Sequence, residues 1–157
     1  MRRGGRNQRK ASAGYSLIEM VTVLGILAIV FLFSQFWLVS QLPKWRLQGA
    51  TRQVVSDFIE TKSQAVTQGN KHRVTFLDAH RYSILDDDNN NGRPDPAEHV
   101  AIHDIHTDYE DVMLTSTNHP IFHPRGTASN LATVTLSNAA GSKVITVSIT
   151  GRVTIKS

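Results

Sequence analysis

The chain has 157 residues and a formal net charge of +4, from 17 Lys and Arg against 13 Asp and Glu. This length suits one modest domain with appendages rather than two full domains. Five of the basic residues lie in the first ten positions, and without residues 1–14 the remainder has 12 basic against 13 acidic residues, a formal charge of −1. The net positive charge is therefore no argument for a nucleic-acid-binding body.

A basic leader, residues 1–14, precedes a long apolar segment. Residues 20–42 carry no formal charge, and as a helix rising ~1.5 Å per residue they would span roughly 34 Å, enough for a bilayer core of about 30 Å. We predict a transmembrane helix over residues 15–42. The basic leader should stay on the cytoplasmic side, which places the C-terminal body across the membrane. A cleaved secretory signal would have a shorter apolar region and a small-residue cleavage site, which residues 34–37 lack.

Glu19 stands at the start of this apolar segment. A carboxylate in lipid costs several kcal/mol unless it is paired, and intramembrane charges are usually functional. A plain signal anchor does not explain this residue, whereas a positively charged partner would satisfy it. The alternative is that Glu19 sits solvated among the lipid headgroups.

The run G-Y-S-L-I-E-M from Gly14 to Met20, placed after a basic leader, resembles the cleavage motif of type IV prepilins and type II secretion pseudopilins. The resemblance implies that a prepilin peptidase cuts after Gly14 and that Tyr15 becomes the N-methylated first residue. Glu19 would then be the fifth residue of the mature chain. The freed N-terminal amine of a neighbouring subunit could supply its positive partner during filament assembly.

Pro43 removes a backbone donor, so a kink or local break is expected there. The chain then becomes amphipathic over residues 43–70. The apolar positions that recur at three- and four-residue steps are Leu47, Ala50 or Thr51, Val54, Phe58 and Ala65. This pattern predicts a helix that ends near Gln68, before Gly69 and Asn70, with its apolar stripe against a sheet of the same chain.

Residues 71–157 alternate in polarity and are rich in β-branched side chains, which predicts a β-rich head. The expected strands cover residues 72–78, 81–86, 99–105, 112–117, 132–137, 143–150 and 152–156. The fold class is therefore α+β, a long N-terminal helix packed on an antiparallel β-rich head. The chain has no cysteine, so such a head must rely on its apolar core, a bound metal or neighbouring subunits for stability.

Three later stretches, residues 65–76, 122–128 and 149–153, are similar to the GspH/FimT branch of the pilin-like superfamily and occur in that family's order. The resemblance implies a β-sandwich-like or curved-sheet head that leans on the C-terminal half of the long helix.

Residues 87–98 match the D-x-[DN]-x-[DN]-G-x₅-E pattern of calcium-binding loops at every specified position. The ligands would be Asp87, Asn89, Asn91, Arg93 through its carbonyl oxygen, Asp95 and Glu98. Two features depart from the usual context, because strands rather than helices flank the loop and prolines stiffen its second half. The alternative is a polar hairpin tip rich in Asn and Gly. Ca²⁺ is the one cofactor for which the sequence offers a candidate site.

The histidines and other reactive residues form no recognised catalytic or zinc pattern. His99 and His103 share a strand face by parity, whereas His106 does not. Because zinc needs three or four converging ligands at a recognised spacing, we interpret these residues as solvated, neutral strand histidines. No nucleophile with a patterned base and no phosphate-binding glycine loop is present, so we expect a protein that is not an enzyme.

The C-terminal tail is similar to the Gly-Arg-x-Arg motif of FimT-type DNA receptors, but Thr154 replaces the second arginine. Arg152 and Lys156, together with Arg125, could contact phosphate, although so few charges on a body of net −1 give weak, salt-sensitive attraction. The alternative is a final edge strand whose charges discourage aggregation.

The resemblance and the residues together predict a minor pilin or pseudopilin. The expected partners are other pilins through the N-terminal helix, a prepilin peptidase and inner-membrane lipid. The protein would be a single-pass inner-membrane protein with its head in the periplasm, and later part of a pilus or pseudopilus. A filament-borne DNA receptor is the alternative, and the sequence leaves open whether the filament is a type IV pilus or a type II secretion pseudopilus.

Overall fold

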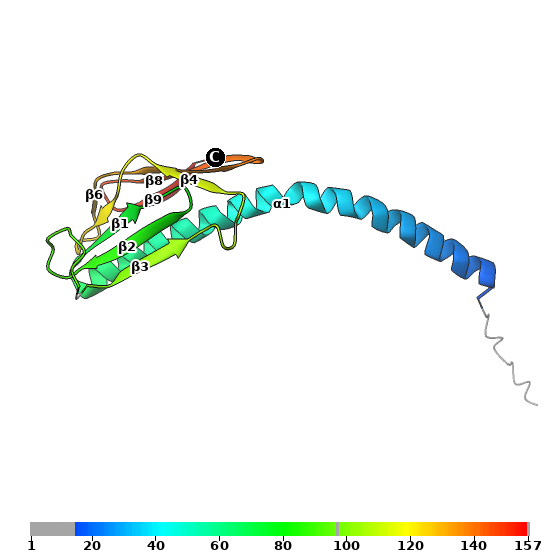
Figure 1. The fold of residues 1–157 in the computed structure, drawn as a ribbon, viewed down its shortest axis with the longest axis horizontal. Helices are drawn as coiled ribbons and strands as arrows, with labels where there is room; N and C mark the ends of the chain where they lie inside the picture. The colour runs from blue at the N-terminus through cyan, green and yellow to red at the C-terminus, as the bar shows by residue number, and fades with distance from the viewer. Residues whose placement is uncertain (1–14, 97, 157) are drawn as a thin grey trace, which may run out of the picture. The chain divides into compact units, whose positions relative to one another are not determined.

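The computed structural model describes residues 15–96 and 98–156, without the side chains of residues 34–38. The described part holds one long helix followed by short strands (Figure 1). The elements are α1 Leu17–Gln68, β1 Lys71–Phe76, β2 Arg81–Asp87, β3 Val100–Asp104, β4 Met113–Ser116, β5 Ile121–Phe122, β6 Ala128–Ser129, β7 Thr133–Asn138, β8 Gly141–Val147 and β9 Val153–Lys156. The chain divides into two compact units, with the boundary between Ser40 and Gln41.

Side-chain and glycine signals mark both ends of α1. At the start, the Ser16 hydroxyl accepts a hydrogen bond of 3.3 Å from the backbone N–H of Glu19, as an N-cap residue does. At the end, Gly69 adopts a φ of 79° and donates its N–H to the carbonyl of Ala65 at 3.2 Å. A glycine reaches this left-handed conformation without steric cost, so the predicted end at Gln68 is confirmed.

The helix continues through Pro43, where the sequence had predicted a kink or local break. A proline removes only one backbone donor, so tertiary contacts can hold the neighbouring turn in place. Here the Pro43 carbonyl accepts a hydrogen bond of 2.7 Å from the Asn138 side chain. One turn further on, Arg46 pairs with Glu110 at 3.0 Å and with Asp111 at 3.5 Å.

The apolar side chains of α1 that precede the boundary are exposed wherever they are described. Leu17, Leu24 and Phe33 are 82%, 64% and 74% exposed, respectively. Judged on the residues described, none of the helices combines the length and apolar character that crossing a membrane requires. The transmembrane helix over residues 15–42 therefore stays a prediction from the sequence.

The strands form two antiparallel sheets. The first has the order β3-β2-β1-β5-β6 and the second the order β4-β7-β8-β9. The alternation of polarity had placed seven of these strands to within a few residues. It missed β5 and β6, because two-residue strands are too short to show a period of two.

The core lies where the head covers the C-terminal part of α1 (Figure 1). The predicted stripe is buried, and Val54, Phe58 and Ala65 have no exposed surface. The Phe58 ring lies 6.3 Å from Phe122 and 6.5 Å from Tyr82, which brings β5 and β2 onto the helix. The predicted α+β fold, with a long helix packed on antiparallel sheets, is confirmed.

Candidate functional site

The N-terminal motif lies at the start of α1. Gly14, the predicted cleavage residue, lies outside the described residues. Tyr15 is 79% exposed, and Glu19 is exposed in the first turn of the helix. The structure therefore leaves both side chains accessible, as recognition by a second protein requires.

Glu19 also has a local role that the sequence analysis missed. The spacing Ser16-x-x-Glu19 is that of a capping box, and the Ser16 half of it is present. A negative charge in the first turn also interacts favourably with the helix dipole, by about 0.3–1 kcal/mol. This is less than the cost of an unpaired carboxylate in lipid, so capping does not replace the need for a positive partner.

The predicted calcium-loop residues lie between β2 and β3, and a hydrogen-bonded network brings most of them together. The Asp95 carboxylate accepts hydrogen bonds from the side-chain amides of Asn89 at 2.6 Å and Asn91 at 2.7 Å. The Asn91 carbonyl oxygen accepts the N–H of Arg93 at 2.6 Å. Glu98 accepts the N–H of Asp95 at 3.1 Å.

Carboxylates and histidines alone do not converge on a metal centre in the described chain. Within it, no group of three or more His, Asp or Glu residues is placed to hold a metal ion.

The predicted DNA-contacting residues are only partly clustered. Arg125 and Arg152 are exposed, and each is next to a glycine, Gly126 or Gly151. The turns at these two glycines pack closely, because a Cβ on Gly151 would collide with the carbonyl oxygen of Gly126. Lys156 lies at the far end of β9, an edge strand of the second sheet. The structure thus brings the two arginine-bearing turns together and leaves the lysine apart.

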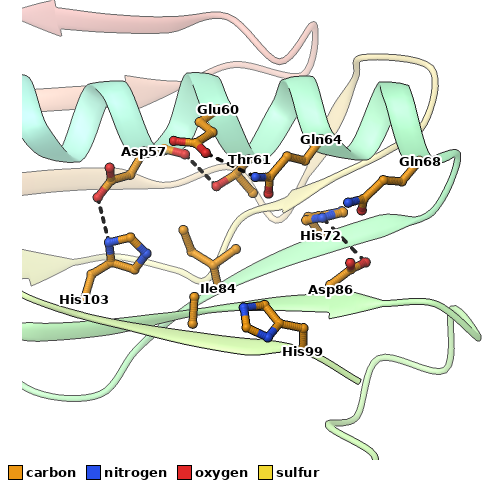
Figure 2. Close-up of a pocket in the computed structure, with 11 residues that line it drawn as sticks. Asp57, Glu60, Thr61, Gln64, Gln68, His72, Ile84, Asp86, His99 and His103 are labelled. Atoms are coloured by element: carbon orange, nitrogen blue, oxygen red, sulfur yellow. Dashed lines mark hydrogen bonds and ion pairs between the residues drawn. The ribbon is translucent and has the colours of Figure 1, made fainter. Parts of the chain in front are cut away.

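A cavity of about 340 Å³ lies between the C-terminal part of α1 and the first sheet. Figure 2 shows polar side chains of the helix facing histidines and a carboxylate of the sheet. The lining residues are Asp57, Glu60, Thr61, Gln64, Gln68, His72, Ile84, Asp86, His99, Ala101 and His103. The cavity supplies hydrogen-bonding and titratable groups but no Ser, Cys or Lys nucleophile.

Asp57 is the central polar residue of this cavity. Its carboxylate lies 3.1 Å from Nδ1 of His103 and accepts a hydrogen bond from the hydroxyl of Tyr82. The rings of Tyr82 and His103 stack with their centroids 5.2 Å apart. Burial, together with the hydrogen bond to Asp57 and its negative charge, raises the pKa of Tyr82 far above the usual range.

The prediction of solvated strand histidines does not hold for His103, and His72 was not considered in it. His72 is only 1% exposed and lies 3.5 Å from Asp86, and His103 pairs with the helix through Asp57. The shared face of His99 and His103 is confirmed, since both line the cavity. Strand parity indicated that face, but nothing in the spacing indicated that a helix carboxylate would meet it.

Comparisons with known proteins agree with this architecture. The model of a family described as type II transport protein GspH matches residues 50–151. The type IV minor pilin FimU of Pseudomonas aeruginosa is 20% identical, with a TM-score of 0.54, and the match covers 71% of this chain and 93% of that chain. The minor pseudopilin EpsH of the Vibrio cholerae type 2 secretion system is 10% identical, with a TM-score of 0.56, and the match covers 71% and 97%. The comparison with curated proteins gave no match.

At these identities the two solved structures show only that the fold over the matched part of the chain is shared. The family match runs from the buried stripe of α1, through both sheets, to the turn before β9. It covers more than half of the chain and agrees with the GspH/FimT resemblance of the sequence. The chain belongs to the GspH family of type II transport proteins, whose fold it shares with minor pilins and pseudopilins.

Proposed function

We propose that the chain works as a minor pilin or pseudopilin, a structural subunit that enters a type IV pilus or type II secretion pseudopilus after its leader is cleaved. The observation that carries this proposal is that an exposed carboxylate, Glu19, lies on a helix segment whose apolar side chains are also exposed. A helix segment of this kind needs an environment other than water, either lipid or other helices.

Two environments meet this need in succession. Before assembly, inner-membrane lipid covers the apolar side chains of α1 and the basic leader keeps the N-terminus cytoplasmic. After a prepilin peptidase removes residues 1–14, the helices of other pilins replace the lipid. The amine freed at Tyr15 of one subunit can then pair with Glu19 of its neighbour, which gives the contact a defined register.

The head supports the structural role. Its two sheets are tied to α1 through a continuous apolar core. The head would therefore present a rigid surface to other minor subunits.

The proposal is tested by replacing Glu19 with alanine and quantifying the variant in sheared filaments, relative to the membrane fraction. We expect Glu19→Ala to accumulate normally in the membrane but to be strongly depleted from filaments, because a neighbouring amine has lost its partner. Glu60→Ala is the matched control, since Glu60 is an exposed acid on the same helix. Equal incorporation of Glu19→Ala and wild type would contradict the proposal.

The DNA-receptor alternative has less support. Thr154 stands where the tail motif has its second arginine, and Lys156 lies apart from the two arginine-bearing turns. Binding of duplex DNA that survives ~150 mM salt and is lost in Arg152→Ala would favour the receptor instead.

A further inference from the structure

We propose that a cavity at the base of the head, the end of the head nearest Pro43, binds the headgroup of an anionic phospholipid. The cavity has a volume of about 440 Å³ and lies between α1 and the β7–β8 hairpin. The lining residues are Lys44, Leu47, Gln48, Ala140, Gly141, Ser142 and Lys143. This inference rests on the proposed function, because it concerns the stage at which the chain is still in the inner membrane.

Hydrogen bonds from one side chain hold the two walls of this cavity together. The amide of Asn138, at the end of β7, donates to the Pro43 carbonyl at 2.7 Å and to the carboxylate of Asp111 at 2.9 Å. The amide oxygen of Asn138 accepts the N–H of Ala140 at 2.9 Å, which holds the hairpin turn. The helix wall and the hairpin wall are therefore joined directly beside the cavity.

The lining combines positive charge with hydrogen-bond donors. Among the described residues that line the cavity, the charged ones are Lys44 and Lys143. Each lysine ammonium carries three donors and no acceptor, and Gln48 and Ser142 add an amide and a hydroxyl. Such a donor set favours an oxyanion, and lysine is a common ligand of phosphate. The volume lies in the range of small-molecule sites, which is more than a bare ion needs.

The place of Lys44 along the chain points to a lipid as the source of the phosphate. Lys44 is the second residue after the uncharged run of residues 20–42, and α1 is continuous over both. At ~1.5 Å per residue, the helical path from Glu19 to Lys44 is roughly 38 Å. This exceeds the ~30 Å hydrocarbon core but not the ~40–45 Å of a whole bilayer. With Glu19 at the cytoplasmic boundary, Lys44 falls among the headgroups of the opposite leaflet.

The neighbouring tryptophan supports the same depth. The Trp45 side chain is 49% exposed, and Leu42, three residues before it on the helix, is 38% exposed. Tryptophan is enriched at membrane interfaces, where its ring meets apolar surface and its N–H meets polar groups. Lysine side chains at such a boundary extend their ammonium groups toward the headgroups. An exposed tryptophan next to a lysine-lined cavity therefore favours a surface that faces lipid.

The charges around the cavity make the two lysines the local attraction for an anion. Without residues 1–14 the chain has a formal charge of −1, so the body as a whole is not drawn to an anionic surface. The guanidinium of Arg46 pairs with Glu110 at 3.0 Å and with Asp111 at 3.5 Å. A bound headgroup would hold the base of the head at the membrane surface and would be released when the subunit enters a filament.

The test measures which lipid lies beside Trp45 in the full-length protein reconstituted into nanodiscs. The chain has two tryptophans, so a Trp37→Phe background leaves Trp45 as the fluorophore. Lipids with brominated acyl chains quench tryptophan on contact. Brominated phosphatidylglycerol or phosphatidylcholine, each mixed with the other lipid in unbrominated form, gives the relative affinity for the two headgroups. We expect a preference for phosphatidylglycerol of at least about tenfold, since each lysine near anionic lipid contributes about fivefold.

Three variants test the cavity, and a fourth is the matched control. Lys44→Gln and Lys143→Gln should each lower the preference about fivefold. Gln48→Phe should also lower it, because the ring would fill the cavity while both lysines remain. Arg52→Gln should leave it unchanged. Arg52 is exposed on the same helix but lies about 12 Å further along than Lys44, beyond a Debye length of ~8 Å.

Three outcomes would overturn the proposal. Equal quenching by the two lipids in the wild type would show that the cavity selects no headgroup. A preference that Gln48→Phe retains in full would reflect surface charge alone. A preference abolished by millimolar glycerol phosphate would assign the cavity to a soluble phosphate ester.

The proposed function fails in a different way. A chain that does not enter the nanodiscs at all would contradict the membrane stage, and this inference with it. The filament stage is measured separately through Glu19→Ala, so a loss of lipid preference with normal assembly would overturn only the headgroup site.

Discussion

At the scale of single residues, Asp57 joins the helix to the first sheet through polar contacts. It accepts the hydroxyl of Tyr82 from β2 and faces Nδ1 of His103 from β3. Tyr82 has no exposed surface, so its hydroxyl depends on this carboxylate for a partner. The polar contact therefore sets the register of the helix on the sheet as well as contributing to stability.

This contact leads to a prediction for Tyr82→Phe. At neutral pH we expect the free energy of unfolding to fall by about 1–2 kcal/mol, because Asp57 loses a largely buried donor. The variant should still assemble its core, since the aromatic ring stays in place.

The same variant should change the alkaline pH dependence. In the wild type, burial and Asp57 raise the pKa of Tyr82, so the folded protein keeps this proton while the unfolded chain releases it above about pH 10. The stabilisation is therefore complete below that pH and declines as the pH rises further. For Tyr82→Phe, the free energy of unfolding should fall less steeply between about pH 9 and 11 than it does for the wild type. A decline as steep as that of the wild type would contradict this assignment.

At the scale of elements, two glycines make the backbone turns at the end of α1 and before β9. Gly69 ends α1 at a φ of 79°, and a Cβ added there would meet nothing within 4 Å. Gly151 turns the chain into β9 at a φ of 65°, directly against the backbone of Gly126. Both need the left-handed conformation, but only Gly151 also needs the absence of a side chain.

The two glycines therefore make a matched pair of alanine variants. Gly69→Ala should cost about 1–2 kcal/mol, because only the backbone conformation is strained. Gly151→Ala should cost more, by a further 1–3 kcal/mol or so, because its methyl group collides with a carbonyl that other backbone holds in place. Denaturant unfolding of both variants measures the difference, and equal losses would show that the turns at Gly126 and Gly151 separate easily.

At the scale of the whole molecule, the proposed role requires the leader to be removed before assembly. Gly14→Ala should leave full-length precursor in the membrane, because the resemblance implies that a prepilin peptidase cuts after this glycine. Immunoblotting of membranes would show a single slower band for Gly14→Ala. Gly25→Ala is the matched control, since a Cβ on Gly25 meets nothing within 4 Å. Processing of Gly14→Ala at the wild-type rate would remove the prepilin assignment.

Patterns within a few residues of each other were sufficient to predict much of the fold. The recurrence of Leu47, Val54 and Phe58 identified the buried face of α1, and Gly69 identified its end. Such signals are readable from sequence because each depends on the period of one element or on the conformation of one residue. The family resemblance of the later stretches rests on the same local patterns.

Features that depend on pairs distant in the chain required the folded structure. Local patterns alone predicted a long helix, most of the strands and a candidate calcium loop at residues 87–98. Folding then placed Asp57 against His103 and added β5 and β6 to the first sheet beside β1. These contacts join segments tens of residues apart, and local periodicity carries no information about which of many polar or apolar residues will meet across the core.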